Sequence, residues 1–424
     1  MTVPQRGDGQ GTPWDGVDRT GETMQFYVDP SFFMLLVVAL VPAVVLGALG
    51  RRIRTYGLLV SLAFLVGLFW GDWLGLGLAL GYMLVTFATT RLVLARTVSD
   101  GQGAVTSPAP LALRLLALAA CLVPLVTYKL TVSFGQGLLG FVGISYITFR
   151  ATQVLLEVTD GLIDRVPFVD YLYFLSFFPT FTSGPIDRSR RFFADAERTL
   201  DRWEYLDRLG RGILMVLVGL VMELVLATIA QKFDVPAALD LTKPIVPQLG
   251  SAVVVAYAYA AYLYFDFAGY SLMAQGVGLA LGVDVPRNFN LPFLSCSMQE
   301  FWDRWNITLS HWLRDFAFMR LERTMARHRL PKGRDTRASV GLVANMLLMG
   351  AWHGITPAYL TYGLYHGVLL ALEQRLHRHW KFWRKHKDDR AVRIASWFVT
   401  LQLVVFGLSI FSGQLFTFLG GIHG

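Results

Sequence analysis

A histidine that ends an apolar stretch is the residue of this chain best suited to proton transfer. His353 stands in MGAWHGITP, where Gly354 and Pro357 stop or kink a helix immediately after it. An ionisable side chain in such a place indicates a function, and imidazole exchanges protons near neutral pH. The plainer alternative is a neutral histidine that hydrogen-bonds a neighbouring helix. We expect His353 to be functional.

The second place for chemistry is the segment 300–321, EFWDRWNITLSHWLRDFAFMRL. Spacings of three and four residues predict one helix, with one side formed by Trp302, Trp305, Leu309, Trp312 and Phe316. A neighbouring side carries Asp303, Asn306, Ser310 and Arg314, and one-turn spacing predicts the pairs Glu300–Arg304 and His311–Asp315. This helix is too polar for lipid and too rich in tryptophan for a solvated surface. We expect this helix to lie at a membrane interface or to line a water-filled cavity with its polar side. It is the best candidate for the functional surface of the protein.

Asp266 is another ionisable residue inside an apolar run. It stands between Phe265 and Phe267 in YLYFDFAGYS, where an isolated charge would be costly in lipid. We expect Asp266 to pair with an arginine such as Arg304 or Arg314, or otherwise to line a tunnel.

Four further side chains have weaker claims to catalysis. His366 lies near the end of the next apolar run, which favours a packing role. Ser310 and His311 resemble a nucleophile and a base, but adjacent residues of a helix point apart. We therefore expect Ser310 to be a supporting hydrogen-bond donor and His311 to lie at the interface. Cys296 could accept an acyl group by thioester exchange, but a lone cysteine in an apolar protein is more often a small core residue.

The sequence predicts no metal site. His353 and His366 are too far apart to bind a metal from one helix face, and no HExxH motif occurs. Cys121 and Cys296 are also far apart, so neither a metal-binding cysteine pair nor a disulfide framework is expected.

Composition indicates a membrane protein. The 424 residues are 54% hydrophobic and only 16% charged, with a mean hydropathy of +0.47. In soluble domains about a quarter of the residues are charged. The net charge of +8 comes from basic residues concentrated in loops between apolar runs. The positive-inside rule explains this pattern more simply than binding of nucleic acid.

The apolar runs predict an all-α polytopic protein with roughly ten to twelve transmembrane or re-entrant segments, at about 20 residues for a full crossing. The clearest predicted segments are 32–50, 56–70, 74–90, 111–130, 209–229, 253–281, 338–352, 358–372 and 394–418, with 134–158 and 171–182 less regular. Residues 1–30 are predicted to be a flexible polar tail outside the cell, because Arg51 and its neighbours mark the inner side. Residues 31–424 are predicted to form a single integral membrane domain without internal repeats.

Several motifs together resemble the membrane-bound O-acyltransferase family. They are GISYITFR, LSFFPTFTSGPIDRSRRF, LYFDFAGYS, the tryptophan segment, MGAWHG and YGLYHG, and they occur in the family's order between residues 143 and 367. Within the family they are most similar to the D-alanyl transferase branch (the DltB type), although the alginate O-acetyltransferase branch shares three of them. The resemblance implies a helical membrane fold around a central tunnel.

The resemblance also implies roles for individual residues. The family's histidine corresponds to His353, which we expect to act as general base. The second key position corresponds to Asn306, where bacterial members commonly have histidine, so this chain has RWN in place of RWH. We expect the Asn306 amide to orient His353 or to donate to the oxyanion, and not to transfer protons. Supporting or tunnel-lining roles are predicted for Asp303, Arg304, Ser310, Asp266, His366 and Trp305.

The activity implied is transfer of an activated acyl group, most similar to D-alanyl, from the phosphopantetheine arm of a carrier protein on the cytoplasmic side. The acceptor would be a hydroxyl of an envelope polymer such as teichoic acid, or a helper protein, and no cofactor would be bound. The expected location is the cytoplasmic membrane of a bacterium, in contact with lipids and not with nucleic acid. Pro185, Asp187 and Arg188 resemble an entrance for the carrier, and basic clusters at 320–337 and 375–393 could steer an acidic carrier.

Other functions remain open from the sequence. O-acetylation of an exopolysaccharide would use the same motifs. A transporter or flippase would suit many spans with broken helices, although there is no set of intramembrane carboxylates for ion coupling. A non-catalytic scaffold is the third alternative, because one of the usual bacterial histidines is replaced by Asn306. The acyl group, the acceptor and the oligomeric state are not encoded in these residues.

Overall fold

The computed structural model describes residues 26–27, 29–99, 105–132 and 134–420. The predicted all-α membrane fold is confirmed: within this part of the chain the regular secondary structure is helical except for a short ribbon of β1 (Val98–Ser99) and β2 (Val105–Ser107). Six helical stretches among the described residues are long and apolar enough to cross a membrane. They are α1 (Pro30–Ala48), α3 (Trp73–Ala95), α4 (Leu111–Val132), the continuous stretch from α8 (Arg202–Leu220) to α9 (Thr228–Gln231), α10 (Ile245–Ala280) and α17 (Arg390–Phe411).

The other helices are shorter or more polar. Several of the ten to twelve predicted embedded segments fall on these helices, which are not long and apolar enough to count as full membrane spans. The first group is α2 (Arg54–Leu68), α5 (Ile144–Thr159), α6 (Phe168–Ser176), η1 (Phe178–Thr180) and α7 (Ser189–Glu197). The second group is η3 (Pro292–Leu294), α11 (Met298–Trp302), α12 (Ile307–Leu313), η4 (Arg314–Phe318), α13 (Met319–His328), α14 (Arg334–His353), α15 (Pro357–His379), α16 (Lys381–His386) and α18 (Gln414–Gly420).

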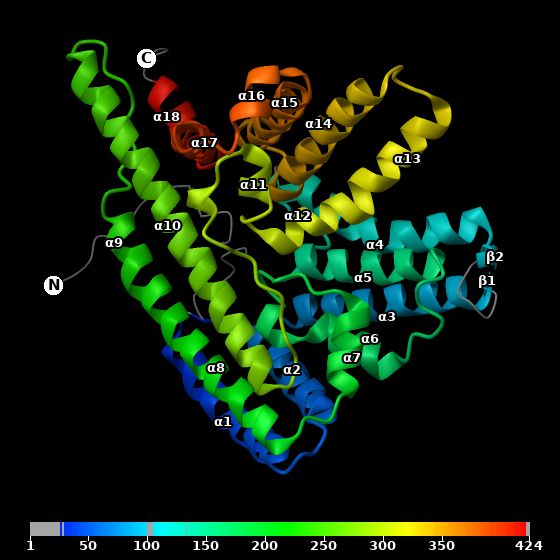
Figure 1. Cartoon of the computed structure of the whole chain (residues 1–424). Coiled ribbons are helices and arrows are strands. Elements are labelled where there is room, and N and C mark those ends of the chain that lie inside the picture. The colour runs from blue at the N-terminus through cyan, green and yellow to red at the C-terminus, as the bar shows by residue number, and fades with distance from the viewer. Residues whose placement is uncertain (1–25, 28, 100–104, 133, 421–424) are drawn as a thin grey trace.

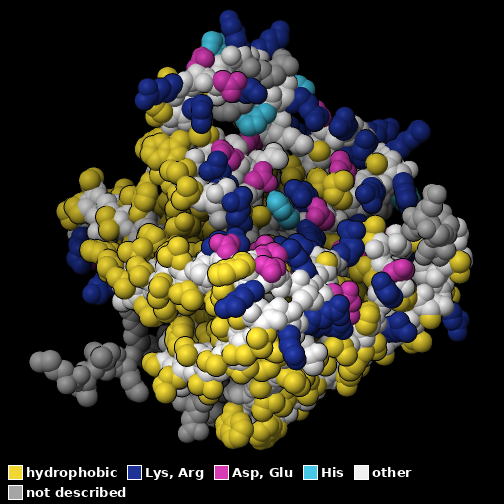
Figure 2. All heavy atoms as spheres, turned by 60° about the horizontal axis from the view of Figure 1, so that its bottom comes forward, with side chains coloured by type: hydrophobic (Ala, Val, Ile, Leu, Met, Phe, Trp, Pro, Cys, Tyr) yellow, Lys and Arg dark blue, Asp and Glu magenta, His cyan; other side chains and the backbone are white. Residues whose placement is uncertain are grey.

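Three groups of helices are visible in Figure 1. The long helices α8 and α10 run side by side along one edge with α1 against them, and α3, α4 and α5 pack together on the opposite side. The helices α11 to α15 and α17 form the third group, which lies between the other two and carries both His353 and the tryptophan segment. Figure 2 shows hydrophobic side chains covering broad areas of the surface, as expected for a protein whose outer helices face lipid.

The helices α14 and α15 form a hairpin with very close backbones. A Cβ atom on Gly350 of α14 would collide with the carbonyl oxygen of Tyr359, and one on Gly363 of α15 would collide with that of Met346. Small residues allow such close packing between helices in membranes. The contact fixes the end of α14, and therefore His353, against α15.

The predicted continuous helix over 300–321 is wrong. The chain forms α11, leaves helical geometry between residues 303 and 306, and then continues through α12, the π-helical η4 and α13. Asn306 has a φ of 42°, in the left-handed region, which ends one helix and redirects the next. The spacing of side chains along a single helix therefore does not apply across this break.

The predicted boundary of the tail at residue 30 is too late. Residues 1–25 and 28 lie outside the described residues, but Phe26 and Tyr27 are buried in the core. The Tyr27 hydroxyl donates to the carbonyl oxygen of Pro179 at 3.2 Å, and its ring packs edge-on against Tyr270. These two residues belong to the folded body. The last predicted span is also shorter, because the turn at Gly413 separates α17 from α18.

Candidate active site

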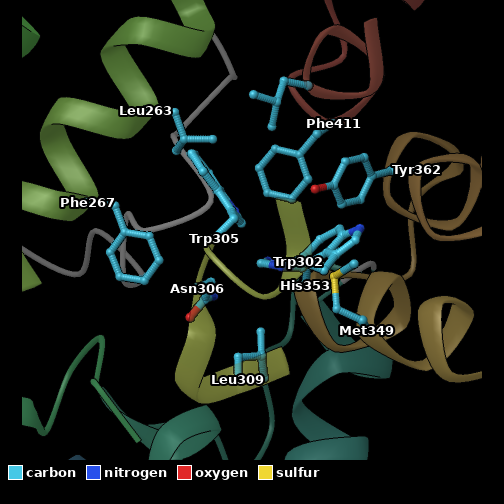
Figure 3. A pocket seen from close by; sticks show the side chains of 11 residues that line it. Leu263, Phe267, Trp302, Trp305, Asn306, Leu309, Met349, His353, Tyr362 and Phe411 are labelled. Atoms are coloured by element: carbon cyan, nitrogen blue, oxygen red, sulfur yellow. The ribbon is translucent and has the colours of Figure 1, made fainter. Parts of the chain in front are cut away.

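A small cavity, with about 20 Å³ of space for the centres of water-sized molecules, lies where α10, the tryptophan segment, α14, α15 and α17 meet. Its walls come from segments far apart in the sequence: Leu263, Phe267, Trp302, Trp305, Asn306, Leu309, Met349, His353, Tyr362, Leu408 and Phe411. Figure 3 shows the labelled side chains arranged around this space. His353 and Asn306, the two residues predicted to act together, both line it.

His353 is the last residue of α14, and aromatic rings surround its imidazole. The ring centroids of Trp352, Phe411 and Tyr359 lie 4.5, 4.9 and 5.9 Å from that of His353. The backbone carbonyl oxygen of His353 accepts a hydrogen bond of 3.0 Å from Nζ of Lys129 on α4. A cation at a helix C-terminus satisfies a carbonyl that has no partner within the helix and interacts favourably with the helix dipole.

Asn306 lies at the turn between α11 and α12, and only 4% of it is exposed. Among non-glycine residues, Asn, Asp and His tolerate its left-handed backbone best. Its Oδ1 atom is buried and has no hydrogen-bond partner among the described residues. An amide placed on the wall of the cavity and left unsatisfied by the protein is available to a bound substrate.

The turn at Asn306 is held in place by Asn288, a buried residue that the sequence analysis did not single out. Oδ1 of Asn288 accepts hydrogen bonds from the backbone N–H of Thr308 at 3.3 Å and from its hydroxyl at 2.6 Å. The backbone carbonyl of Asn288 accepts from the N–H of Ile307 at 2.9 Å. Thr308 Oγ1 in turn accepts from the N–H of Ile186 at 3.0 Å, which ties the turn to the loop before α7.

The other predicted site residues are divided between the cavity and its surroundings. Trp305 and Trp302 both line the cavity, and Nε1 of Trp302 is buried without a hydrogen-bond partner among the described residues. The Ser310 hydroxyl donates to the Trp305 carbonyl oxygen at 3.3 Å, so it supports the turn from outside the cavity. Asp303 is exposed, and Arg304 forms the predicted ion pair with Glu300 at 2.6 Å.

His366 is completely buried behind the cavity wall. Its ring lies 4.5 Å from that of Tyr362 and 5.2 Å from that of Trp302, and neither nitrogen has a hydrogen-bond partner among the described residues. A Cβ on Gly407 would collide with Nε2 of His366, so the imidazole packs directly on α17. His366 therefore packs in the core and is not among the residues that line the cavity, and its supporting role stays a prediction.

Asp266 lies on α10 and does not line the cavity. It interacts electrostatically with Glu223 of η2 (Val221–Ala227), the π-helical part of the α8–α9 span. Both predicted partners of Asp266 are engaged elsewhere: Arg304 pairs with Glu300, and Arg314 pairs with Asp315 at 3.0 Å. Asp315 also forms an ion pair with Arg188 at 2.5 Å. Asp315, the predicted partner of His311, therefore pairs with two arginines.

The predicted entrance around Asp187 and Arg188 is a network of charges beside η4. Arg191 pairs with Asp187 at 2.7 Å, and the guanidinium of Arg188 lies 5.1 Å from the ring centroid of Phe316. Burial raises the pKa of Asp187 to about 6, against the opposing effect of Arg191. The ion pair between Arg188 and Asp315 joins this loop to the tryptophan segment.

Comparison with known proteins assigns the family. The model of the membrane-bound O-acyltransferase family matches residues 58–416. The chain belongs to this family. It is 34% identical to the teichoic acid D-alanyltransferase of Bacillus subtilis, over 91% of this chain and 97% of the relative. The protein of the same description from Lacticaseibacillus rhamnosus is 35% identical, over 92% of this chain and 98% of the relative. The probable alginate O-acetylase AlgI of Pseudomonas aeruginosa is 34% identical, over 64% of this chain and 49% of that protein.

Membership of this family makes the chain an O-acyltransferase, so the transporter alternative is set aside. His353 and Asn306 both line one cavity of this fold. Sequence reasoning missed most of the apolar wall. Tyr362 could have been found, because it lies four residues before His366 on the same helix face, whereas nothing in its own sequence context marks Phe411, the last residue of a long apolar run.

Proposed function

We propose that this enzyme transfers D-alanyl groups to a hydroxyl of teichoic acid in a bacterial cytoplasmic membrane. The observation that carries the proposal is the extent of the similarity to teichoic acid D-alanyltransferases. These relatives match 91–92% of this chain and 95–98% of their own length, at 34–35% identity. The donor we propose is the thioester of a phosphopantetheine carrier protein that approaches from the cytoplasm.

The cavity offers the groups that this reaction needs. The acceptor hydroxyl must lose its proton as its oxygen attacks the thioester carbonyl, and a neutral imidazole of His353 can take that proton. A C–O bond forms, the C–S bond breaks, and the carrier thiolate leaves and recovers a proton. The Asn306 amide can donate to the oxygen of the tetrahedral intermediate, a contribution of about 3 kcal/mol for one well-placed donor.

The surrounding residues position these two groups. Lys129 holds the carbonyl of His353, and Asn288 holds the turn that carries Asn306. The aromatic and aliphatic wall leaves little room for water, which would otherwise hydrolyse the thioester. Access for the donor and the acceptor through a tunnel stays a prediction.

A second candidate function is O-acetylation of an exopolysaccharide. It is favoured by the identity of 34% to a probable alginate O-acetylase over 275 residues, which is as high as the identity to two of the D-alanyltransferases but over a shorter part of both chains.

The test is transfer of label in proteoliposomes. Carrier protein charged with radiolabelled D-alanine, and separately an acetyl donor, would be offered to the purified enzyme together with teichoic acid. We expect label from D-alanine to appear in the polymer and label from acetate not to. Transfer from the acetyl donor alone would move the enzyme to the O-acetylating branch and would contradict the proposal.

A further inference from the structure

Aromatic side chains form a large part of the cavity wall, which carries no formally charged carboxylate, ammonium or guanidinium group. Five of the ten lining residues other than His353 are aromatic, namely Phe267, Trp302, Trp305, Tyr362 and Phe411, and none of the eleven is an Asp, Glu, Lys or Arg. Figure 3 shows Trp305, Phe411, Tyr362 and Trp302 around the same space. The donor under the proposed function, on which this inference rests, differs from other short acyl groups by a single cationic substituent, the α-ammonium.

We propose that this aromatic wall, with Phe411 as its central member, selects the donor by binding the α-ammonium group of the aminoacyl thioester. Aromatic faces attract a cation within about 6 Å of the ring centroid, and the attraction increases when the cation is removed from water. A site without a lining carboxylate can hold an ammonium group in this way. It can also release the ammonium once the ester has formed, because no buried ion pair has to be broken.

The position of Phe411 relative to His353 supports its central place. The ammonium nitrogen is two bonds from the reacting carbonyl carbon, and that carbon must lie next to the hydroxyl from which His353 takes a proton. The ring centroid of Phe411 is 4.9 Å from that of His353, with the two planes at 88°. A substituent two bonds from the reacting carbon therefore falls within reach of the Phe411 ring.

The neighbouring rings limit the aromatic surface that a cation can reach. Phe411 meets Tyr362 at 5.0 Å and 63°, and Trp302 meets Tyr362 at 6.3 Å and 64°. Tyr359 also meets Phe411, at 5.0 Å and 56°. In edge-to-face and tilted contacts the edge of one ring lies against the face of another, so a cation would reach only the ring surface that lines the cavity. Trp305 stacks on Phe301 at 22° and still lines the cavity, where an indole offers the strongest cation–π attraction of the aromatic side chains.

The test compares two donors of the same shape. Carrier protein is charged with D-alanine or with isobutyrate, in which a methyl group replaces the ammonium, and transfer to teichoic acid is measured for each. We expect the wild type to prefer D-alanyl, and Phe411→Leu to reduce the ratio of the two kcat/KM values by about three- to thirtyfold. Phe411→Tyr, which keeps the ring, should change that ratio by less than about twofold.

Leu408 provides the matched control, because it lines the same cavity one turn earlier on α17 and has no ring. Leu408→Val should change transfer of both donors by the same factor. Trp305→Phe, which keeps a weaker ring, should reduce the ratio by less than Phe411→Leu and serves as the readout if the leucine variant does not fold.

Two results would overturn the inference while leaving the proposed function in place. The first is D-alanyl transfer by the wild type, with the same ratio of the two kcat/KM values in Phe411→Leu and Trp305→Phe as in the wild type. The second is a loss of preference for D-alanyl in Leu408→Val as large as that in Phe411→Leu. A wild type that transfers acetyl or isobutyryl groups but no D-alanyl would contradict the proposed function itself, and the inference with it.

Discussion

The backbone at Asn306 explains why only a few residue types suit this position. Its φ of 42° is costly for most side chains, whereas Asn and His are among those that tolerate it. The histidine expected at this position from the family resemblance and the asparagine of this chain would therefore both suit this backbone. What the substitution changes is the side-chain group presented to the cavity, an amide donor instead of an imidazole.

Replacing Asn306 tests this interpretation at the level of one residue. We expect Asn306→His to retain transfer within about tenfold, and Asn306→Gly to lose about a hundredfold because it keeps the backbone geometry but removes the amide. Rates of label transfer in proteoliposomes give both values. Full activity of Asn306→Gly would show that the amide has no role, and complete loss in Asn306→His would show that only an amide serves.

The elements that position the site were only partly predictable from the sequence. Hydropathy located the spans well, as for α4, which was predicted over 111–130 and extends over Leu111–Val132. The break at residues 303–306 was missed, since the hydrogen bonds that stabilise it come from Asn288 and Ile186, outside the segment. Local spacing describes a helix only while no distant residue competes for its backbone groups.

The Asn288 network should be essential to the turn. We expect Asn288→Ala to lower the free energy of unfolding by about 1–3 kcal/mol, because Thr308 is left with buried donors that lack their acceptor. Thermal unfolding in detergent would measure the change, with transfer activity falling in parallel. The control is Asn290→Ala, whose side chain is exposed and whose backbone hydrogen bond to Arg304 is retained. Equal stability of the two variants would contradict this role.

Lys129 links α4 to the end of α14. Its hydrogen bond to the His353 carbonyl should hold the imidazole in place, so we expect Lys129→Met to reduce kcat about tenfold, as for the loss of a charge-assisted hydrogen bond. Label transfer at saturating donor measures this effect. Lys243→Met, at an exposed lysine paired with Asp240, should leave the rate unchanged. A wild-type rate in Lys129→Met would show that α14 needs no support from α4.

At the scale of the whole molecule, charge is distributed unevenly. Figure 2 shows Lys and Arg side chains gathered on the parts of the surface that the hydrophobic areas leave free. The helix α13 contributes exposed Arg323 and Arg327, with Arg329 directly after it. Such a surface favours one orientation in the membrane. Under the proposed function we expect it also to attract the carrier protein over the distance of a Debye length, about 8 Å at physiological salt.

Steering of the carrier predicts a salt dependence. We expect kcat/KM for the charged carrier to fall at least severalfold between low and physiological ionic strength, because screening reduces the rate of encounter. Replacing Arg323, Arg327 and Arg329 with glutamine should lower kcat/KM at low salt and flatten this dependence, while kcat stays the same. If kcat/KM did not change with salt, these arginines would have no role in steering the carrier and would serve only membrane orientation and contact with lipid.

The central claim is that His353 catalyses acyl transfer in the cavity it shares with Asn306. The most direct measurement is transfer of radiolabelled D-alanine from the carrier to teichoic acid by proteoliposomes containing wild type, His353→Ala or His311→Ala. His311 lies outside the cavity and provides a matched histidine control. We predict that His353→Ala folds and loses transfer by about a hundredfold or more, as for the removal of a general base, while His311→Ala stays active. A folded His353→Ala protein that transfers label at the wild-type rate would contradict the account.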